Sequence, residues 1–145
     1  MPNRRPTDPY GNFRFAIEID GVVQAAFMQC SGLEASIDVI EVRDGSERVG
    51  GSRKLPGRVR YANIVLRRGF TASADLWNWF KAAADGAVQR RMGTVIVYDE
   101  DRTEAGRYVF HDGWPCRWKS LDLDAGASAP LIEEIEIAVE RIERG

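Results

Sequence analysis

Apolar and polar residues alternate along most of this chain, and this alternation predicts β-strands. In residues 13–19, FRFAIEI, the side chains of Phe13, Phe15, Ile17 and Ile19 fall on one side, and arginine, alanine and glutamate fall on the other. Successive side chains of a strand point to opposite faces, so a period of two indicates a strand with one buried face. The chain therefore begins its regular structure with a half-buried strand.

The Asp20-Gly21 pair that follows is a strong hairpin signal between two apolar runs. We therefore expect residues 22–30 to return antiparallel to the first strand. The final segment starts after Pro130 and alternates β-branched residues with glutamate, which favours a strand over a helix. The same reasoning predicts further strands over residues 35–42, 59–67, 93–100, 107–115, 115–125 and 130–142.

Only one segment has the period of an amphipathic helix, and it is predicted over about residues 74–86. Ser73 is the expected N-cap, and Gly86 is the expected C-terminal stop. Leu76 and Phe80 begin an apolar stripe that two alanines continue at helical spacing.

The two tryptophans of this helix, Trp77 and Trp79, cannot both face the core, because positions two apart diverge by about 200° around a helix. One is expected in the core and the other at an edge or a subunit contact. The helix residues that we expect to pack are Leu76, Trp77 and Phe80.

The pattern stops between Arg43 and Gly57, where RDGSERVGGSRKLPG contains four glycines and one proline. This stretch predicts a long loop, and loops of this length are usually functional or disordered. Seven or eight strands with one helix and one long loop predict a mainly β fold, an antiparallel β-barrel or sandwich with Greek-key-like connections. At 145 residues the chain is expected to form a single domain over residues 1–145.

Charge changes this picture because it is separated along the chain. The net charge is −2, yet residues 43–68 hold eight basic and two acidic side chains, and residues 120–145 hold two basic and seven acidic ones. A DNA-binding domain is expected to carry a surplus of positive charge. A protein that binds copies of itself head to tail instead needs complementary patches on one chain. Ordinary solvated faces are the remaining explanation.

Candidate chemistry is sparse. The sequence contains no glycine-rich phosphate loop, zinc-protease motif or nucleophile elbow, and its single histidine, His111, excludes a site with two imidazoles. Cys30 and Cys116 match no metal-ligand spacing and are expected to be buried, reduced thiols. Asp122 and Asp124 could serve an acid–base enzyme only in a cleft that raises their pKa values. No catalytic residue, cofactor or metal is therefore expected.

The sequence also lacks the patterns of a membrane span and of a signal peptide. The apolar run over residues 22–28 is far shorter than the roughly 20 residues that a membrane span needs. The N-terminus MPNRRPTDPYGN has two arginines but no apolar region after them, so we expect no secretory signal peptide and no membrane insertion. The chain is expected to be made in the cytoplasm.

Residues 53–70, RKLPGRVRYANIVLRRGF, carry six basic side chains and no acidic one. Clustered cations neutralise phosphates, so one hypothesis is a small β-barrel module that binds single-stranded nucleic acid. The face that this hypothesis uses consists of Arg58, Arg60, Tyr61, Arg67 and Arg68. The net negative charge argues against it.

Six segments occur in an order that is similar to a known family: DPYGNFRFAIEIDG, FMQCSGLEASIDVIEVRDG, KLPGRVRYANIVLRRGFTASADLWNWF, GTVIVYDE, GWPCRWKSLDLDA and IEEIEIAVERI. Together they resemble the tail-tube proteins of contractile phage tails and related contractile injection systems, over Asp8 to Ile142. The resemblance implies a β-barrel subunit with one flanking helix that is not an enzyme. It also implies hexameric rings that stack into a hollow tube inside a contractile sheath.

This resemblance further implies partners and interface residues. The expected partners are copies of the chain itself as a homo-hexamer in stacked rings, the sheath, the baseplate or hub, and a tube terminator, with DNA or effector protein passing through the lumen. In proteins that the chain resembles, the loop corresponding to Arg43–Gly57 projects into the next ring, so the basic stretch is expected to meet acidic surface there. The residues expected at interfaces are Arg43, Asp44, Glu47, Arg48, Arg53, Lys54, Leu55, Pro56, Arg58, Glu134 and Glu136.

Overall fold

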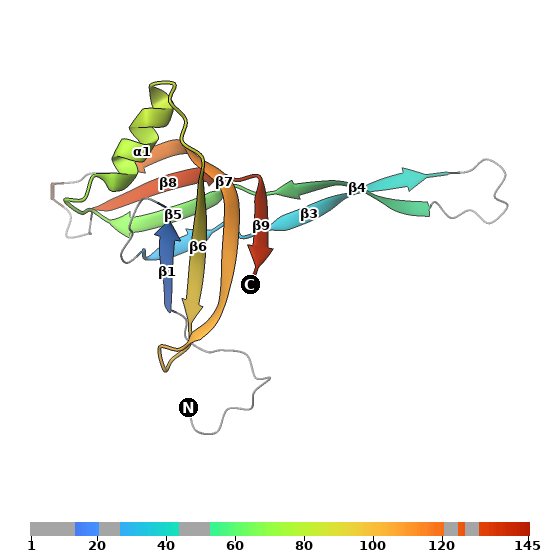
Figure 1. The fold of residues 1–145 in the computed structure, drawn as a ribbon, viewed down its shortest axis with the longest axis horizontal. Helices are drawn as coiled ribbons and strands as arrows, with labels where there is room; N and C mark the ends of the chain where they lie inside the picture. The colour runs from blue at the N-terminus through green and yellow to red at the C-terminus, as the bar shows by residue number, and fades with distance from the viewer. Residues whose placement is uncertain (1–13, 21–26, 44–52, 121–124, 127–130) are drawn as a thin grey trace.

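The computed structural model describes residues 14–20, 27–43, 53–120, 125–126 and 131–145, and all structural statements concern these residues (Figure 1). They form nine strands and one helix. In chain order these are β1 (Arg14–Ile19), β2 (Gln29–Ser31), β3 (Ala35–Val42), β4 (Arg53–Tyr61), β5 (Ile64–Gly69), α1 (Asp75–Ala84), β6 (Arg91–Tyr98), β7 (Glu104–Ser120), β8 (Ile132–Ala138) and β9 (Arg141–Arg144).

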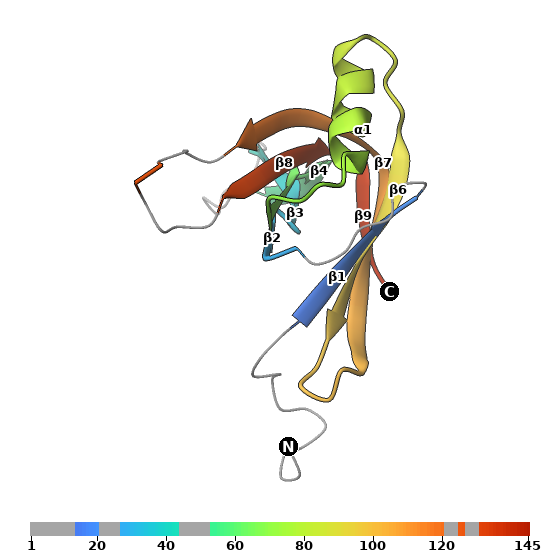
Figure 2. The same ribbon diagram turned by 90° about the vertical axis from the view of Figure 1, so that its left-hand side faces the viewer.

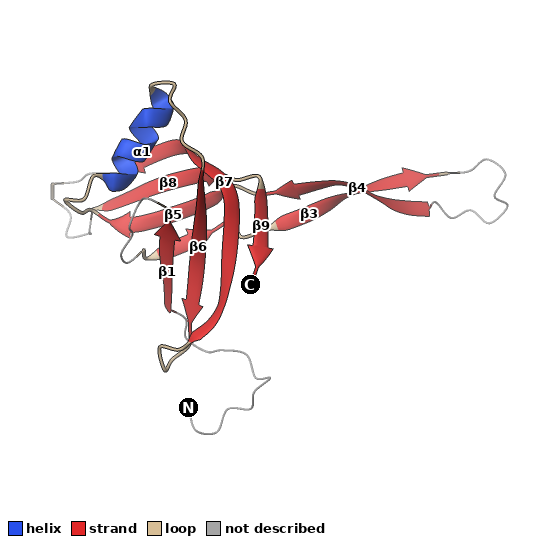
Figure 3. Ribbon diagram, in the orientation of Figure 1, coloured by secondary structure: helices blue, strands red, loops and turns tan. Residues whose placement is uncertain are grey.

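Seven strands form one sheet with the order β1-β6-β7-β8-β5-β2, and β9 pairs with β7 beside this path. The strands β3 and β4 form a separate two-stranded sheet (Figure 3). All the strand pairs are antiparallel. The predicted mainly β, antiparallel fold with one helix is thus confirmed. Its closure into a barrel stays a prediction, because β1 and β2 stand at the two ends of the strand order.

Strand β7 connects the two halves of the large sheet. Its first half pairs with β6 and β9, and its second half pairs with β8. Between them Asp112 has a φ of 53°, in the left-handed region, which residues other than glycine, asparagine and aspartate rarely enter. Figure 2 shows β7 curving from one layer into the other. The sequence predicted two strands here, and the structure has one continuous, bent strand that ends at Ser120.

The core lies between the two halves of this sheet. Alternate residues of β1 and β6 face alternate residues of β5 and β8, as a period of two requires. The buried core cluster consists of Ile17, Ile19, Phe27, Ile64, Leu66, Leu76, Trp79, Val95, Phe110, Ile135 and Ile137. None of these residues belongs to β3 or β4.

Phe110 is the largest fully buried side chain, and two glycines make room for its ring. A Cβ atom on Gly93 would lie 2.1 Å from the ring, and one on Gly113 would lie 2.6 Å from it. Atoms that close would clash, so both positions require glycine in the present packing.

Helix α1 packs against the end of the large sheet beside β7 and β8 (Figure 1). The predicted cap at Ser73 is wrong, because the N-cap is Ala74 and no side chain bonds there. The backbone N–H of Ser73 instead donates to the hydroxyl of Thr71. The predicted stop agrees with Gly86, whose φ of 91° lies in the left-handed region typical of a helix end.

Within the helix, the buried residues are Leu76 and Trp79. Trp79 is 2% exposed, and its indole N–H donates to the carbonyl of Gln89 at 2.8 Å. Trp77 is 44% exposed, and Phe80 is half-buried. One tryptophan in the core and the other near the surface is the arrangement that the sequence predicted.

Several strand boundaries and partners differ from the predictions. Strand β1 pairs with β6, and the described part of the segment that follows, β2, pairs with β5, so the predicted pairing of residues 22–30 with the first strand is wrong for β2. Residues 21–26 lie outside the described part. A turn signal is local and does not determine which strands become neighbours. The predicted strands 59–67 and 130–142 are each divided, near 62–63 and 139–140. At the first break the chain passes from pairing with β3 to pairing with β2 and β8, and at the second it passes from the second half of β7 to the first half.

Candidate assembly interface

Strands β3 and β4 form a long arm that extends away from the rest of the molecule (Figure 1). We define the β3–β4 arm as residues 35–43 and 53–61. Its cross-strand pairs run from Ala35↔Tyr61 at the base to Val42↔Arg53 far out. Ile37 pairs with Val59, and Val39 pairs with Pro56. One residue of β3 therefore lies opposite two residues of β4 between these pairs, and the extra residue forms a β-bulge in β4.

One face of the arm is apolar over two adjacent cross-strand pairs. Ile37 lies opposite Val59, and Val39 lies opposite Pro56. All four side chains are exposed, and Val39 is 63% exposed. We call these four residues the Ile37 face. Beyond them Glu41 and Lys54 lie opposite one another.

The opposite face of the arm is apolar as well. Ile40 and Leu55 are cross-strand partners, Val42 follows on the same side, and all three are exposed. We call these three residues the Ile40 face. A two-stranded hairpin with apolar residues on both faces has no core of its own and is marginally stable in water at best. Exposed apolar patches of this kind mark interaction sites, so the arm is a candidate interface.

Part of the predicted loop is strand. The loop prediction for residues 53–57 is wrong, because these residues belong to β4 and pair with β3. The proline and glycine there suggested a loop, but a two-stranded sheet with a bulge accommodates both. Arg43 follows β3 outside any strand. Asp44, Glu47 and Arg48 lie outside the described residues.

Six of the predicted interface residues come together on the arm, and all are exposed: Arg43, Arg53, Lys54, Leu55, Pro56 and Arg58. The two predicted glutamates are elsewhere, on β8 in the body. Glu134 is 8% exposed and accepts a 2.7 Å hydrogen bond from the guanidinium of Arg67. Glu136 accepts a 2.9 Å hydrogen bond from the amide of Asn63. Both carboxylates therefore have partners in their own chain.

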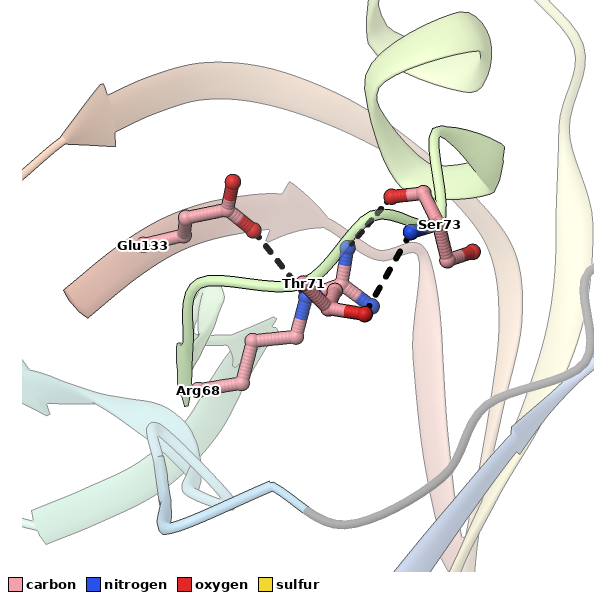
Figure 4. Close-up of polar contacts among 4 residues, drawn as sticks. All are labelled: Arg68, Thr71, Ser73 and Glu133. Atoms are coloured by element: carbon pink, nitrogen blue, oxygen red, sulfur yellow. Dashed lines mark hydrogen bonds and ion pairs between the residues drawn. The ribbon is translucent and has the colours of Figure 1, made fainter. Parts of the chain in front are cut away.

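The neighbouring Arg68 was not predicted as a buried residue, yet its side chain is 8% exposed. It donates to the carboxylate of Glu133 at 3.2 Å and to the backbone carbonyl of Ser73 at 3.5 Å (Figure 4). Its guanidinium also lies 5.8 Å from the ring centre of Phe27. These contacts tie β5 to β8 and to the segment that leads into α1. The sequence signal is a pair of adjacent arginines in one strand segment and a pair of adjacent glutamates in another, and the register of β5 and β8 places these pairs opposite each other.

These pairs also remove most of the phosphate-binding face of the nucleic-acid hypothesis. Arg67 and Arg68 are engaged by glutamates of β8, and Arg60 donates to both carboxylate oxygens of Asp38 at 3.0 Å. The placement of Arg68 as a surface cation is wrong, because it lies under the helix connection. The proposed face is therefore not assembled in the structure.

A smaller surface, made of aromatic side chains, lies on α1. Trp77 contacts Trp118 edge to face, with ring centres 5.3 Å apart, and Phe80 lies beside both rings. Leu76, the third helix residue expected to pack, is in the core. Trp77 thus packs on Trp118 of β7 and still leaves part of its ring exposed.

The two thiols differ from the prediction and from each other. Cys30 is half-buried on β2, and burial raises the pKa of its thiol to about 11. Cys116 is exposed on β7, so its predicted burial is wrong. Burial and the nearby Glu136 also raise the pKa of Cys116. Both are free cysteines, and both are poor nucleophiles because the thiolate is the reactive form.

A comparison with protein families matches residues 11–143 to the family described as T4-like virus tail tube protein gp19. No curated protein matches the chain. Among solved structures, a chain in the cryo-EM structure of the PVC sheath–tube complex, an extracellular contractile injection system in its extended state, is 27% identical. That alignment covers 97% of this chain and 93% of the other, with a TM-score of 0.84.

Two further structures show the same fold at lower identity. A chain in the anti-feeding prophage cap is 23% identical, with 99% of this chain and 95% of the other covered and a TM-score of 0.84. Hcp1 from Flavobacterium johnsoniae is 20% identical, with 91% and 94% covered and a TM-score of 0.56.

The family match over most of the chain therefore identifies the class as structural tube proteins. The chain belongs to the T4-like virus tail tube protein gp19 family. It is a tail tube protein of the contractile injection system type and a component of a phage-tail-like particle. In the described segments, no helix is long and apolar enough to cross a membrane.

Proposed function

We propose that this single-domain chain forms homo-hexameric rings, and that the rings stack into a hollow tube through which DNA or effector protein passes. The observation that carries the proposal is the β3–β4 arm. It exposes apolar side chains on both faces and pairs with none of the other described strands. Such an arm gains stability only when other molecules cover it, and copies of the same chain are the partners that a tube supplies.

Exposed positive charge on the arm favours a partner surface that is acidic. Arg43, Arg53, Lys54 and Arg58 are all exposed there, so the arm brings positive charge to its neighbour. Acidic surface on the next copy would complement it and fix the register of docking. Glu134 is already paired with Arg67, so other carboxylates of the body would provide that surface.

The remaining partners follow from the relatives. The similar PVC chain was solved in a sheath–tube complex, and similar anti-feeding prophage chains were solved in a baseplate and in a terminating cap. For this chain we propose a sheath, a baseplate or hub, and a terminator as partners, with assembly in the cytoplasm. The proposed role is structural and uses no catalytic residue, metal or cofactor.

Truncation of the arm tests the proposal. Residues Val39–Pro56 are replaced by Asn-Gly, which joins Asp38 to Gly57 and keeps the Ile37↔Val59 pair next to the new turn. All core residues lie outside the deleted segment, so the body should stay folded by circular dichroism. Tubes of the full chain should be visible by negative-stain microscopy, and the truncated chain should form none.

Two outcomes would contradict parts of the proposal. Tubes of normal length from the truncated chain would remove the arm from assembly. Mass measurement of isolated rings should give six subunits, and another number would overturn the hexamer while leaving the tube. A full chain that stays monomeric at high concentration, with neither rings nor tubes, would overturn the whole proposal.

A further inference from the structure

An open groove lies at one end of the core, between β1, β6, β7 and β9, and has a volume of about 360 Å³. Its walls are mainly apolar and include Phe15, Leu33, Val97 and Tyr108. Phe15, Leu33 and Tyr108 also pack against the buried core cluster, so the groove continues the core to the surface. Water in liquid occupies about 30 Å³ per molecule, so the groove has room for roughly a dozen waters or for several aliphatic groups.

The same chain carries an apolar surface that needs a cover. The Ile37 face of the arm, Ile37, Val39, Pro56 and Val59, is exposed over two adjacent cross-strand pairs. The arm points away from its own body, so it cannot reach its own groove (Figure 1). Each chain thus has one apolar projection and one apolar groove at different places. This is the arrangement that a head-to-tail contact between identical copies requires.

The charges at the two surfaces allow one complementary contact. Beyond its apolar pairs, the Ile37 face continues with Glu41 opposite Lys54. The charged residues that line the groove are Arg107 from β7, which pairs with Glu104, and Arg144 from β9. Glu41 can therefore meet Arg144 across the contact.

We infer that the groove between β1, β6, β7 and β9 is the receptor for the Ile37 face of the arm of a neighbouring copy. This inference rests on the proposed function and names the surface on which the arm docks. Apolar side chains of one copy then complete the core of the next, and Glu41 beyond them faces Arg144 of the groove. The Ile40 face remains available to a different contact.

Gly106 allows the groove to be blocked without disturbing the fold. It lines the groove on β7, and a Cβ atom at this position would meet no atom within 4 Å. The Gly106→Phe variant should therefore fill the groove with its own ring. Gly69, at the end of β5, has equally open surroundings but lies outside the groove, so Gly69→Phe is the matched control.

The assembly measurement compares these two variants with the unchanged chain by sedimentation and negative-stain microscopy. Circular dichroism and thermal melting confirm that each variant is folded. We expect Gly106→Phe to lose tubes and Gly69→Phe to form them normally. A folded Gly106→Phe chain that forms tubes of normal length overturns the inference.

Cross-linking tests the same contact without blocking it, because Cys30 also lines the groove. In a Cys116→Ser background, Val39→Cys places a thiol on the Ile37 face, and Val42→Cys places one on the Ile40 face as the control. A short thiol–thiol cross-linker is applied to the tubes at alkaline pH, since burial raises the pKa of Cys30 to about 11. We expect a ladder of covalent oligomers from Val39→Cys only, and none when Cys30→Ala is added.

The outcomes separate this inference from the proposed function. A ladder from Val42→Cys alone, or from neither position, overturns the docking of the Ile37 face. If Gly106→Phe blocks tubes but Val39→Cys gives no ladder, another segment or partner occupies the groove and the inference is also overturned. Tubes that require the arm but tolerate Gly106→Phe leave the proposed function standing. A full chain that never forms tubes overturns both.

Discussion

Strands β8 and β3 have the same kind of sequence and opposite surroundings. In β8, IEEIEIA, the side chains of Ile135 and Ile137 are completely enclosed by the body. In β3, ASIDVIEV, the corresponding alternation leaves Ile37 and Val39 exposed. An alternating pattern indicates that one face of a strand is apolar. It does not indicate whether that face is covered by the same chain or by another molecule. Under the proposed function, we expect the body to fold by itself and the arm to be completed by assembly. The two regions should therefore respond in opposite ways to substitution.

The largest expected effect on stability is in the body, at Trp79. The Trp79→Ala variant removes a buried ring and its hydrogen bond to the carbonyl of Gln89, so the free energy of unfolding should fall by roughly 3–5 kcal/mol. Urea unfolding followed by circular dichroism measures this loss. Phe80→Ala is the comparison, and it should cost roughly 1–2 kcal/mol because that ring is only half-buried. Equal losses at the two positions would contradict this description of the helix.

A buried charge of the body should give the next largest effect. The Glu133→Leu variant removes the carboxylate that accepts a hydrogen bond from the buried guanidinium of Arg68, at a cost of roughly 3 kcal/mol in unfolding free energy. Adding Arg68→Met should recover much of that loss, because replacing both members of a buried ion pair with apolar residues is often neutral. Chemical unfolding of the two single variants and the double variant forms a complete cycle. A double variant as unstable as the worse single variant would show that Arg68 stabilises the connection to α1 through its other contacts.

The arm should behave in the opposite way. Replacing Ile37, Val39 and Val59 together with serine removes exposed apolar surface, so each substitution should change the unfolding free energy by less than about 0.5 kcal/mol. The same variant should form no tubes, because the surface that docks is lost. Thermal melting and negative-stain microscopy on one sample measure both properties. A large fall in melting temperature would mean that the arm belongs to the folding unit of the monomer.

The smallest effect is expected at the exposed ion pair of the arm. Arg60 and Asp38 are both well exposed, and exposed pairs contribute less than about 1 kcal/mol. The Arg60→Gln variant should therefore unfold almost like the unchanged chain, and the small difference between the two should shrink as salt is added. A loss near that of Glu133→Leu would remove the distinction between arm and body that the other variants rely on.

Elements were predictable where the signal is local. The strands expected at 13–19 and 35–42 correspond to β1 and β3, and the helix lies within its predicted range. Partners were not predictable in this way, because the turn at Asp20 does not select β6 as the neighbour of β1. Pairs such as Arg68 with Glu133 depend on the register of β5 and β8, because these two residues are 65 positions apart in the chain and meet only in the folded sheet.

The interface could be predicted only in part for a similar reason. Composition located the basic stretch correctly, but it did not distinguish Arg53, exposed on the arm, from Arg68, buried in the body. The resemblance to tube proteins indicated that the segment projects. The apolar faces remained hidden because Leu55 and Pro56 were assigned to a loop, where exposed side chains need no explanation.

Pro56 bears on what the open edges of the arm can bind. A two-stranded arm has two open edges, and open edges invite strand addition and aggregation. Proline has no N–H and is tolerated in a strand where that donor would face an open edge, so β4 offers an interrupted edge to any added strand. The bulge beside it also bends β4, which makes its edge a poorer template for an added strand. Growth through the edges into amyloid-like ribbons is thereby disfavoured, while contact through the faces stays open, which would favour the proposed tube over other polymers.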